Sequence, residues 1–188
     1  MGTSTLITVE EAASVLAFWF EELEPAQWFR KDESLDTLIK ARFGSVHQAA
    51  ACCELWPWRA TSHGRLAEII VLDQFSRNIY RDQAQAFSCD PVALALAQEA
   101  ISVGADKQLT DAERAFLYMP FMHSESLEIH DSAMELFDDN GLQQNFKHEK
   151  KHRDILQRFG RYPHRNAILG RTSTPEEEKF LTQPGSSF

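Results

Sequence analysis

The sequence has little of what marks secreted, membrane-spanning or nucleic-acid-binding proteins. Its three cysteines include no C-x-x-C pair, and their odd number fits reduced thiols better than a disulfide framework. No run of residues approaches the roughly 20 apolar side chains that cross a bilayer. The first residues also lack the positively charged stretch and apolar region of a secretory signal. These absences predict a cytoplasmic protein that does not contact a membrane.

Positive charge is scarce as well. The 188 residues include 19 lysines and arginines against 28 aspartates and glutamates, and the formal net charge of −9 disfavours nucleic acid as a partner. Hydrophobic residues make up 43% of the chain, which is enough for a globular core. The length predicts a single domain, residues 1–188, in which only residues 183–188 are expected to form a flexible tail.

Helix start signals recur along the chain. Thr8, Thr110 and Thr174 each lie three residues before a glutamate, which is the spacing of a capping box. Asp90 precedes Pro91, and this pair predicts an N-cap followed by proline in the first helical turn. Helices are therefore expected to begin at these four places.

The apolar residues between these signals recur at intervals of three and four, the period of an amphipathic helix, and no β-alternation is present. Gly104, Gly141 and Gly160 lie where glycines commonly end helices. We predict an all-α fold of seven or eight helices, stacked as antiparallel hairpins because the connections are short. The helices are expected at residues 9–22, 34–52, 62–80, 91–103, 111–119, 124–139, 143–159 and 175–182.

The first polar motif is LDQFSRNIYR, at the end of a strongly apolar helix. Asp73, Arg77 and Arg81 are four residues apart and form one stripe, and Gln74 and Asn78 form a second stripe beside it. An exposed ladder of ion pairs is the simpler interpretation. However, the preceding helix is apolar nearly all round, so the stripe is expected to face protein. A buried Asp or Arg must be paired, which leaves a structural pair or a ligand site.

The second motif is PFMHSES. Pro120 is expected to end one helix, and Ser124 or Ser126 to cap the next. His123 is a candidate general acid or base because both of its protonation states are accessible near pH 7, although a lone histidine is more often a core residue. Glu125 either takes part in that chemistry or only stabilises the start of the helix.

The third motif is RFGRYPHRN, within a tract of eight lysines and arginines against two acidic residues. Guanidinium groups bind carboxylate or phosphate in a bidentate manner, so this segment suits anion recognition. The alternative is that its arginines neutralise the acidic remainder of the protein or cap a helix end. The residues concerned are Arg158, Arg161, His164, Arg165 and Asn166.

His148 and His152 have the i, i+4 spacing of two metal ligands. This pair alone is a weak signal because a metal site needs a third and fourth ligand. We therefore predict no metal and no cofactor.

Together, LDQFSRNIYR with AFSCDPVALALA, PFMHSES, and HRDILQRFGRYPHRN with ILGRTSTPEEEKFL resemble the bacterial family known as domain of unknown function 924. The resemblance extends from Phe18 to Leu181 and implies an all-helical, tetratricopeptide-like arrangement. The family pattern has a proline where this chain has Ser76, so a tight turn after Phe75 loses its local support. The family has no established activity, so the resemblance implies a fold and candidate site residues but no reaction. Its motif positions correspond to Asp73, Gln74, Arg77, Asn78, His123, Ser124, Glu125, His152, Arg158, Arg161, His164, Arg165, Asn166 and Arg171.

Three hypotheses about function follow. The first is a binding module in which a groove between stacked helices holds an anionic small molecule or peptide. The second is a hydrolase or transferase with His123 or His164 as acid or base and Glu125 or Asp73 orienting it. The third is an internal ion-pair network in an assembly protein of unknown oligomeric state. The candidate ligand-binding residues are Gln74, Arg77, Asn78, Ser124, Arg158, Arg161, Arg165 and Asn166.

Overall fold

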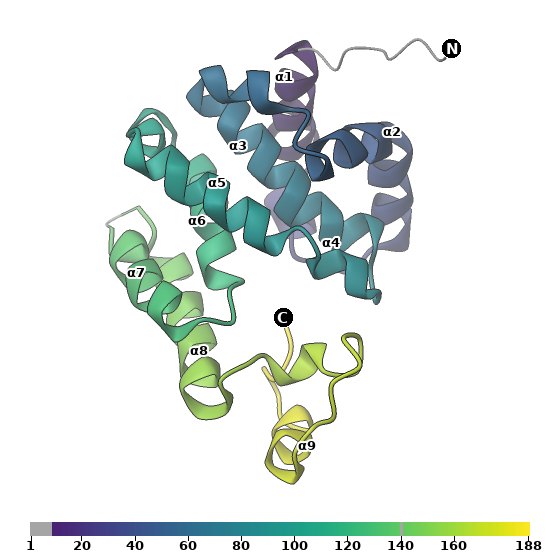
Figure 1. The fold of residues 1–188 in the computed structure, drawn as a ribbon, viewed down its shortest axis with the longest axis vertical. Helices are drawn as coiled ribbons and strands as arrows, with labels where there is room; N and C mark the ends of the chain where they lie inside the picture. The colour runs from purple at the N-terminus through teal and green to yellow at the C-terminus, as the bar shows by residue number, and fades with distance from the viewer. Residues whose placement is uncertain (1–8, 140) are drawn as a thin grey trace.

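The computed structural model describes residues 9–139 and 141–188, which Figure 1 shows as a packed set of helices. Neither described stretch contains a strand. The helices are α1 (Val9–Ala17), α2 (Glu33–Ala51), α3 (Ser62–Ile70), α4 (Ser76–Ile79), α5 (Asp90–Ser102), α6 (Asp111–Met122), α7 (Leu127–Phe137), α8 (Gln143–Phe159) and α9 (Pro175–Leu181). Since α3 and α4 are joined without a break, the described residues form eight helices, and the predicted all-α class is confirmed.

Two of these helices contain a π-helical turn. α1 continues into Phe18–Glu22, and α3 continues into Val71–Phe75, after which the chain passes directly into α4. The Ser76 hydroxyl donates a hydrogen bond to the carbonyl oxygen of Leu72 at 2.6 Å. The tight turn that a proline would favour after Phe75 is therefore absent here. π turns often occur at functional sites, and this one carries the first polar motif.

The centre of the fold is the helix formed by α3 and its π turn. It contacts α1, α5 and α6, and Ile69, Ile70 and Leu72 are fully buried. This confirms that the helix is apolar nearly all round. Asp73 and Gln74 are buried with it, so their polar groups need partners within the protein.

The capping boxes at Thr110 and Thr174 are confirmed. The Thr110 backbone N–H donates to Glu113 at 2.9 Å, and the Thr174 backbone N–H donates to Glu177 at 2.8 Å. The corresponding box at Thr8 lies outside the described residues. These boxes fix the starts of α6 and α9 close to the predicted positions.

The predicted cap at Asp90 is wrong. α5 begins at Asp90 itself and its N-cap is Cys89, whose side chain makes no capping hydrogen bond. The Asp90 carboxylate instead accepts from Arg77 at 2.9 and 3.0 Å. The Asp90 side chain therefore pairs with a charged residue on another helix and does not cap α5.

The expected helix break at Pro120 is also wrong, because α6 continues through it to Met122. Pro120, Phe121 and Met122 are all buried. A proline removes one backbone hydrogen bond, and burial of this last turn compensates for that loss.

Of the glycines expected to end helices, Gly104 and Gly160 adopt left-handed conformations, with φ of 72° and 69°. Gly141 does not have a positive φ, and its N–H donates to Asp139 at 3.1 Å. Its neighbour Asn140 lies outside the described residues.

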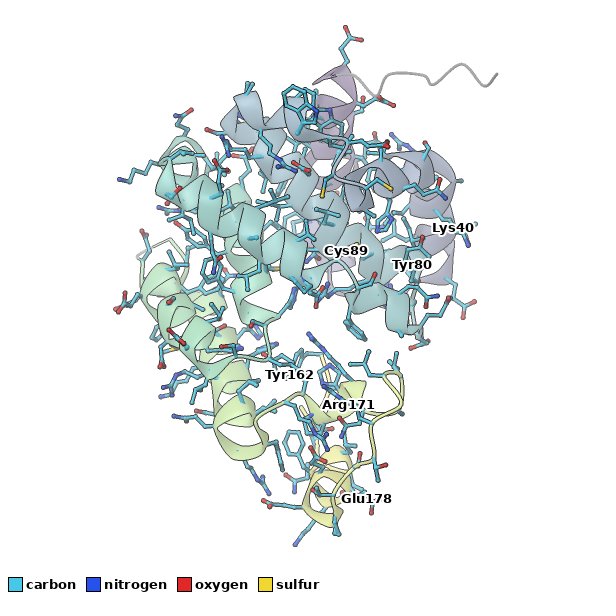
Figure 2. All side chains as sticks on the ribbon, viewed as in Figure 1. Lys40, Tyr80, Cys89, Tyr162, Arg171 and Glu178 are labelled. Atoms are coloured by element: carbon cyan, nitrogen blue, oxygen red, sulfur yellow. The ribbon has the colours of Figure 1, made fainter. Side chains whose placement is uncertain are left out.

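The segment after α8 brings the end of the chain back to the site. Figure 1 shows this segment, in yellow, beside the end of α8, and Figure 2 places Tyr162 and Arg171 on the part of it nearest to the other helices. The rings of Phe159 on α8 and Phe180 on α9 pack at 5.0 Å between centroids. Within the described residues, no helix is long and apolar enough to cross a membrane.

Candidate functional site

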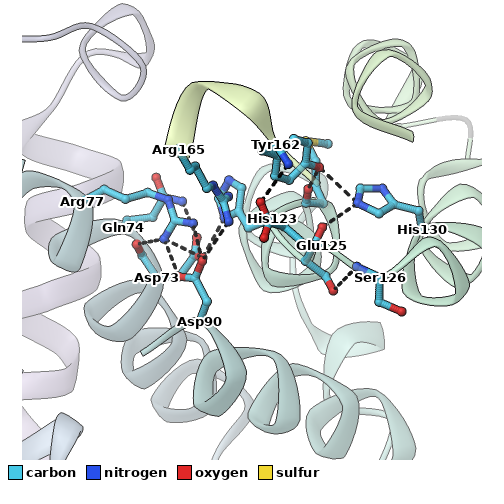
Figure 3. Close-up of polar contacts among 12 residues, drawn as sticks. Asp73, Gln74, Arg77, Asp90, His123, Glu125, Ser126, His130, Tyr162 and Arg165 are labelled. Atoms are coloured by element: carbon cyan, nitrogen blue, oxygen red, sulfur yellow. Dashed lines mark hydrogen bonds and ion pairs between the residues drawn. The ribbon is translucent and has the colours of Figure 1, made fainter. Parts of the chain in front are cut away.

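The three polar motifs converge on one cluster, which Figure 3 shows in close-up. Asp73 comes from the π turn after α3, His123 follows α6, and Arg165 ends the short 3-10 turn Pro163–Arg165. The central contact joins His123 Nδ1 and Asp73 Oδ1 at 2.7 Å. Residues from three distant parts of the sequence therefore form one site.

Asp73 is held as a carboxylate. Its side chain is 1% exposed, its Oδ2 accepts from Gln74 at 2.6 Å, and its Oδ1 lies 3.2 Å from Arg77 Nη1. Burial alone would raise the pKa of Asp73, but the charge of Arg77 and the hydrogen bonds with His123 and Gln74 hold it below its usual value. Asp73 is therefore charged at neutral pH.

His123 is held as a neutral imidazole. Burial, and then the charge of Arg77, lower the pKa of His123 below its usual value, and Asp73 only partly opposes this. Because the Asp73 carboxylate can only accept a hydrogen bond, His123 Nδ1 must donate it. The imidazole proton therefore lies on Nδ1 and the lone pair on Nε2. Nε2 has no hydrogen-bond partner in the described part of the chain, and the side chain remains 14% exposed.

Two arginines share Asp90 beside this pair. Arg77 donates to both Asp90 oxygens at 2.9 and 3.0 Å, while Arg165 Nη1 lies 3.6 Å from Asp90 Oδ2. The guanidinium of Arg165 lies over the rings of Phe87 and Tyr162, at 4.6 and 4.7 Å from their centroids. Arg77 and Arg165 are thus the candidate arginines that the structure brings together with His123.

Glu125 does not orient His123. It accepts from Arg171 at 2.6 and 2.9 Å and from the Tyr162 backbone N–H at 2.7 Å. Burial raises the pKa of Glu125, but the combined effect of these donors is larger and opposite. The pKa of Glu125 therefore lies below its usual value. Of the two carboxylates expected to orient His123, Asp73 has this position and Glu125 anchors the C-terminal segment.

The remaining arginine candidates lie elsewhere, so the four expected arginines do not line one groove. Arg158 donates to Glu176 at 2.9 Å, and Arg161 donates to Glu177 at 2.7 and 2.8 Å. Both carboxylates belong to the first turn of α9. These arginines therefore hold α9 against the preceding segment.

Like Gln74, the other three amide and hydroxyl candidates have partners within the protein. Asn166 donates to Ser173 at 3.0 Å, and Asn78 donates to Asp36 on α2 at 2.8 Å. The Ser124 hydroxyl accepts from the Ser126 backbone N–H at 3.1 Å, so Ser124 supports the start of α7 from a position before its N-cap.

The sequence did not predict a second pair of a histidine with a carboxylate. His130 and Glu149 are completely buried, and His130 Nδ1 lies 2.5 Å from Glu149 Oε1. His130 Nε2 lies 2.9 Å from the Ser124 carbonyl oxygen and 3.1 Å from the Tyr162 hydroxyl. The only signal for this pair was a histidine on a helix with an apolar face, which does not identify its partner.

His152 and His164 both lie against Tyr162 in the same region. His148 and His152, which have the i, i+4 spacing of metal ligands, do not form a metal site with the other described residues. His152 Nδ1 donates to the His148 carbonyl oxygen at 2.8 Å. The described residues contain no group of three or more His, Cys, Asp or Glu side chains arranged to hold a metal ion.

Residues 183–188, expected to be a tail, place an aromatic ring on these histidines. The Phe188 ring centroid lies 3.7 Å from that of His152, 4.5 Å from that of His164 and 5.1 Å from that of Tyr162. Ser186 is buried and donates to the Leu181 carbonyl oxygen at 3.1 Å.

The buried histidines predict unusually early acid destabilisation. Burial lowers the pKa of His152 to about 3 and that of His164 to about 4. Below about pH 6.5 the unfolded chain binds protons at these two positions that the folded protein does not bind. The free energy of unfolding should therefore fall by up to about 1.4 kcal/mol per pH unit for each histidine between pH 6.5 and 5.

Urea unfolding at pH 7, 6 and 5 measures this slope. The double variant His152→Gln, His164→Gln should have a clearly shallower slope. An equal slope in the variant would contradict the assignment.

Two comparisons place the chain among known proteins. The family model described as "Bacterial protein of unknown function (DUF924)" matches residues 15–185. A solved structure of a protein of unknown function, ATU0120 from Agrobacterium tumefaciens, is 39% identical, with a TM-score of 0.86 over 93% of this chain and 98% of that chain. The comparison with curated proteins gives no match. With its motifs and fold in agreement with a family model over almost its whole length, this chain belongs to the DUF924 family.

Proposed function

We propose that this protein is an enzyme in which His123 acts as general base and general acid. The observation that carries the proposal is the 2.7 Å contact between His123 Nδ1 and a fully buried carboxylate, Asp73, with Nε2 left without a partner among the described residues. A histidine fixed in this way has the tautomer, orientation and charge that a general base needs.

The chemistry that suits this arrangement is hydrolysis or group transfer. Nε2 takes a proton from water or from a substrate hydroxyl as that oxygen attacks an acyl or phosphoryl centre. It then returns the proton to the leaving group as the old bond breaks, so the histidine ends neutral as it began. Asp73 stabilises the imidazolium that exists between these steps.

A structural ion-pair network is the second candidate. Its support is that Arg77, Arg161 and Arg171 each have a bidentate carboxylate partner, and that Arg161 and Arg171 tie the C-terminal segment to the rest of the protein. This network accounts for the three arginines. It does not account for a neutral histidine whose outer nitrogen is free, so we favour the enzyme.

A turnover screen tests the proposal. Wild type, His123→Gln and the control His63→Gln are assayed with chromogenic esters, amides and phosphate esters. His63 is a suitable control because its side chain is 57% exposed. At least one substrate class should be turned over by wild type and control, and by His123→Gln only at the background rate. Equal turnover by His123→Gln, or no turnover of any class, would contradict the proposal.

A further inference from the structure

We infer that Arg165 is the receptor for an oxyanion, a carboxylate or phosphate, on the molecule that His123 acts on. This inference names a substrate class for the proposed function and so rests on it. The observation behind it is a buried guanidinium that forms no hydrogen bond with the described residues. The Arg165 side chain is only 6% exposed, and it donates no hydrogen bond to any described residue.

The nitrogen atoms of Arg165 show where a ligand would bind. Nε is buried without a partner, and Nη1 lies 3.6 Å from Asp90 Oδ2, beyond hydrogen-bond distance. Asp90 is already bonded to Arg77 through both oxygens. Among the described residues, the one carboxylate within ion-pair distance of Arg165 therefore already has both oxygens bonded to another cation.

Arg165 differs from other arginines of this protein in its burial and in its hydrogen bonds. Arg77, Arg161 and Arg171 are between 21% and 28% exposed, and each forms two hydrogen bonds to one carboxylate. Arg165 is buried more deeply and forms none. Burying a guanidinium without hydrogen bonds is costly, and proteins tolerate it mainly where function requires it.

Arg165 is also held in a fixed orientation and beside the acid–base pair. The rings of Phe87 and Tyr162 hold its planar group between them. Figure 3 shows Arg77 and Arg165 extending toward each other over Asp90, next to His123. The planar fork of a guanidinium group suits carboxylate and phosphate.

This position defines the substrate class. The substrate carries an oxyanion that binds Arg165 while the bond to be broken lies at His123 Nε2. Developing negative charge at the reacting atom would be stabilised by the same pair of arginines.

Arginine side-chain NMR tests the inference without any turnover. The Arg165 Nε–H signal is identified by its loss in Arg165→Lys, and wild type is titrated with inorganic phosphate and with acetate at constant ionic strength. At least one of these anions should shift this signal in a saturable way. By calorimetry, Arg165→Lys should bind that anion about tenfold or more weakly.

The control is Arg158→Lys, because Arg158 belongs to the same sequence motif but is paired with Glu176 at the surface. Its affinity for the anion should equal that of wild type. No saturable shift with either anion, or unchanged binding by Arg165→Lys, would overturn the inference.

Thermal unfolding gives an independent readout. In anion-free buffer, Arg165→Met should have a Tm equal to or above that of wild type, because the variant removes a buried guanidinium that forms no hydrogen bond. Arg171→Met should have a lower Tm, because it leaves Glu125 without its partner. If Arg165→Met is destabilised as much as Arg171→Met, or does not fold, Arg165 has a structural role and the inference is wrong.

The two proposals fail in different ways. His123→Gln should still bind the anion, since it leaves Arg165 intact. If anions bind at Arg165 but no substrate is turned over, the acid–base function fails and the anion site remains. If turnover depends on His123 but no anion affects the Arg165 signal, the anion site is wrong and the acid–base function remains.

Discussion

Replacing Asp73 by asparagine is expected to lower kcat by about 10²- to 10⁴-fold while the protein stays folded. The substitution keeps the size of the side chain and removes its charge. Gln74 donates to Asp73 Oδ2 at 2.6 Å, and this hydrogen bond favours the asparagine oxygen at the Oδ2 position. Arg77 Nη1, which lies 3.2 Å from Oδ1, keeps its hydrogen bonds to the Asp73 carbonyl oxygen and to Asp90. The asparagine amide N–H then faces His123 Nδ1, which must accept, and the imidazole proton moves to Nε2. A histidine protonated at Nε2 cannot act as the base.

Asp73 acts through His123 and is therefore a positioning residue, so its test needs a readout that a merely structural role would not change. The ¹⁵N chemical shifts of the His123 ring report the tautomer directly, and these shifts should exchange between Nδ1 and Nε2 in Asp73→Asn. The matched control is Asp90→Asn, which removes a carboxylate from the same arginine, Arg77, but leaves the contact between Asp73 and His123 intact. The control should keep the wild-type tautomer.

The rate and the tautomer must change together. If Asp73→Asn changes neither and turnover stays within a few-fold of wild type, Asp73 is only a structural partner of Arg77. If turnover falls but the tautomer is unchanged, the loss comes from electrostatics or stability and the orienting role is wrong.

The helices of this protein could be predicted from the sequence because their signals are local. A capping box such as Thr110 to Glu113 needs only residues within one turn, and the apolar period of α3 is visible in its own sequence. The errors at Asp90 and Pro120 arose where tertiary contacts decided the outcome. Asp90 left its capping position for Arg77, and Pro120 stayed within α6 because its neighbours are buried.

The site was predictable only in part for the same reason. The sequence motifs contain Asp73, His123 and Arg165, which the fold brings together, but the sequence could not show which carboxylate meets which cation. Arg158 and Arg161 have the same local appearance as Arg165, and only the fold places Glu176 and Glu177 against them. Pairing between distant residues is a property of tertiary structure, and no spacing rule in one sequence contains it.

Removing His130 is expected to have the largest effect on stability, lowering the free energy of unfolding by about 3 to 5 kcal/mol in His130→Ala. His130 and Glu149 are both completely buried, and Glu149 Oε2 has no partner in the described part of the chain. Without His130, the buried Glu149 carboxyl group would have no hydrogen-bond partner for either oxygen among the described residues, which is costly in the core. Urea unfolding at pH 7 measures the loss.

The double variant His130→Leu, Glu149→Met distinguishes two contributions to stability. One is the cost of leaving Glu149 without a partner, and the other is the contribution of the pair itself. Apolar side chains of similar volume can replace a buried ion pair with little loss or with a gain, so this variant should recover most of the stability that His130→Ala loses. If the double variant is as unstable as His130→Ala, the loss comes from packing or from the contacts of His130 with Ser124 and Tyr162. A loss of less than about 1 kcal/mol in His130→Ala would show that the contact between His130 and Glu149 contributes little to stability. Because the pair has no solvent access, the double variant should also keep the wild-type turnover, which would confine the chemistry to His123 and its partners.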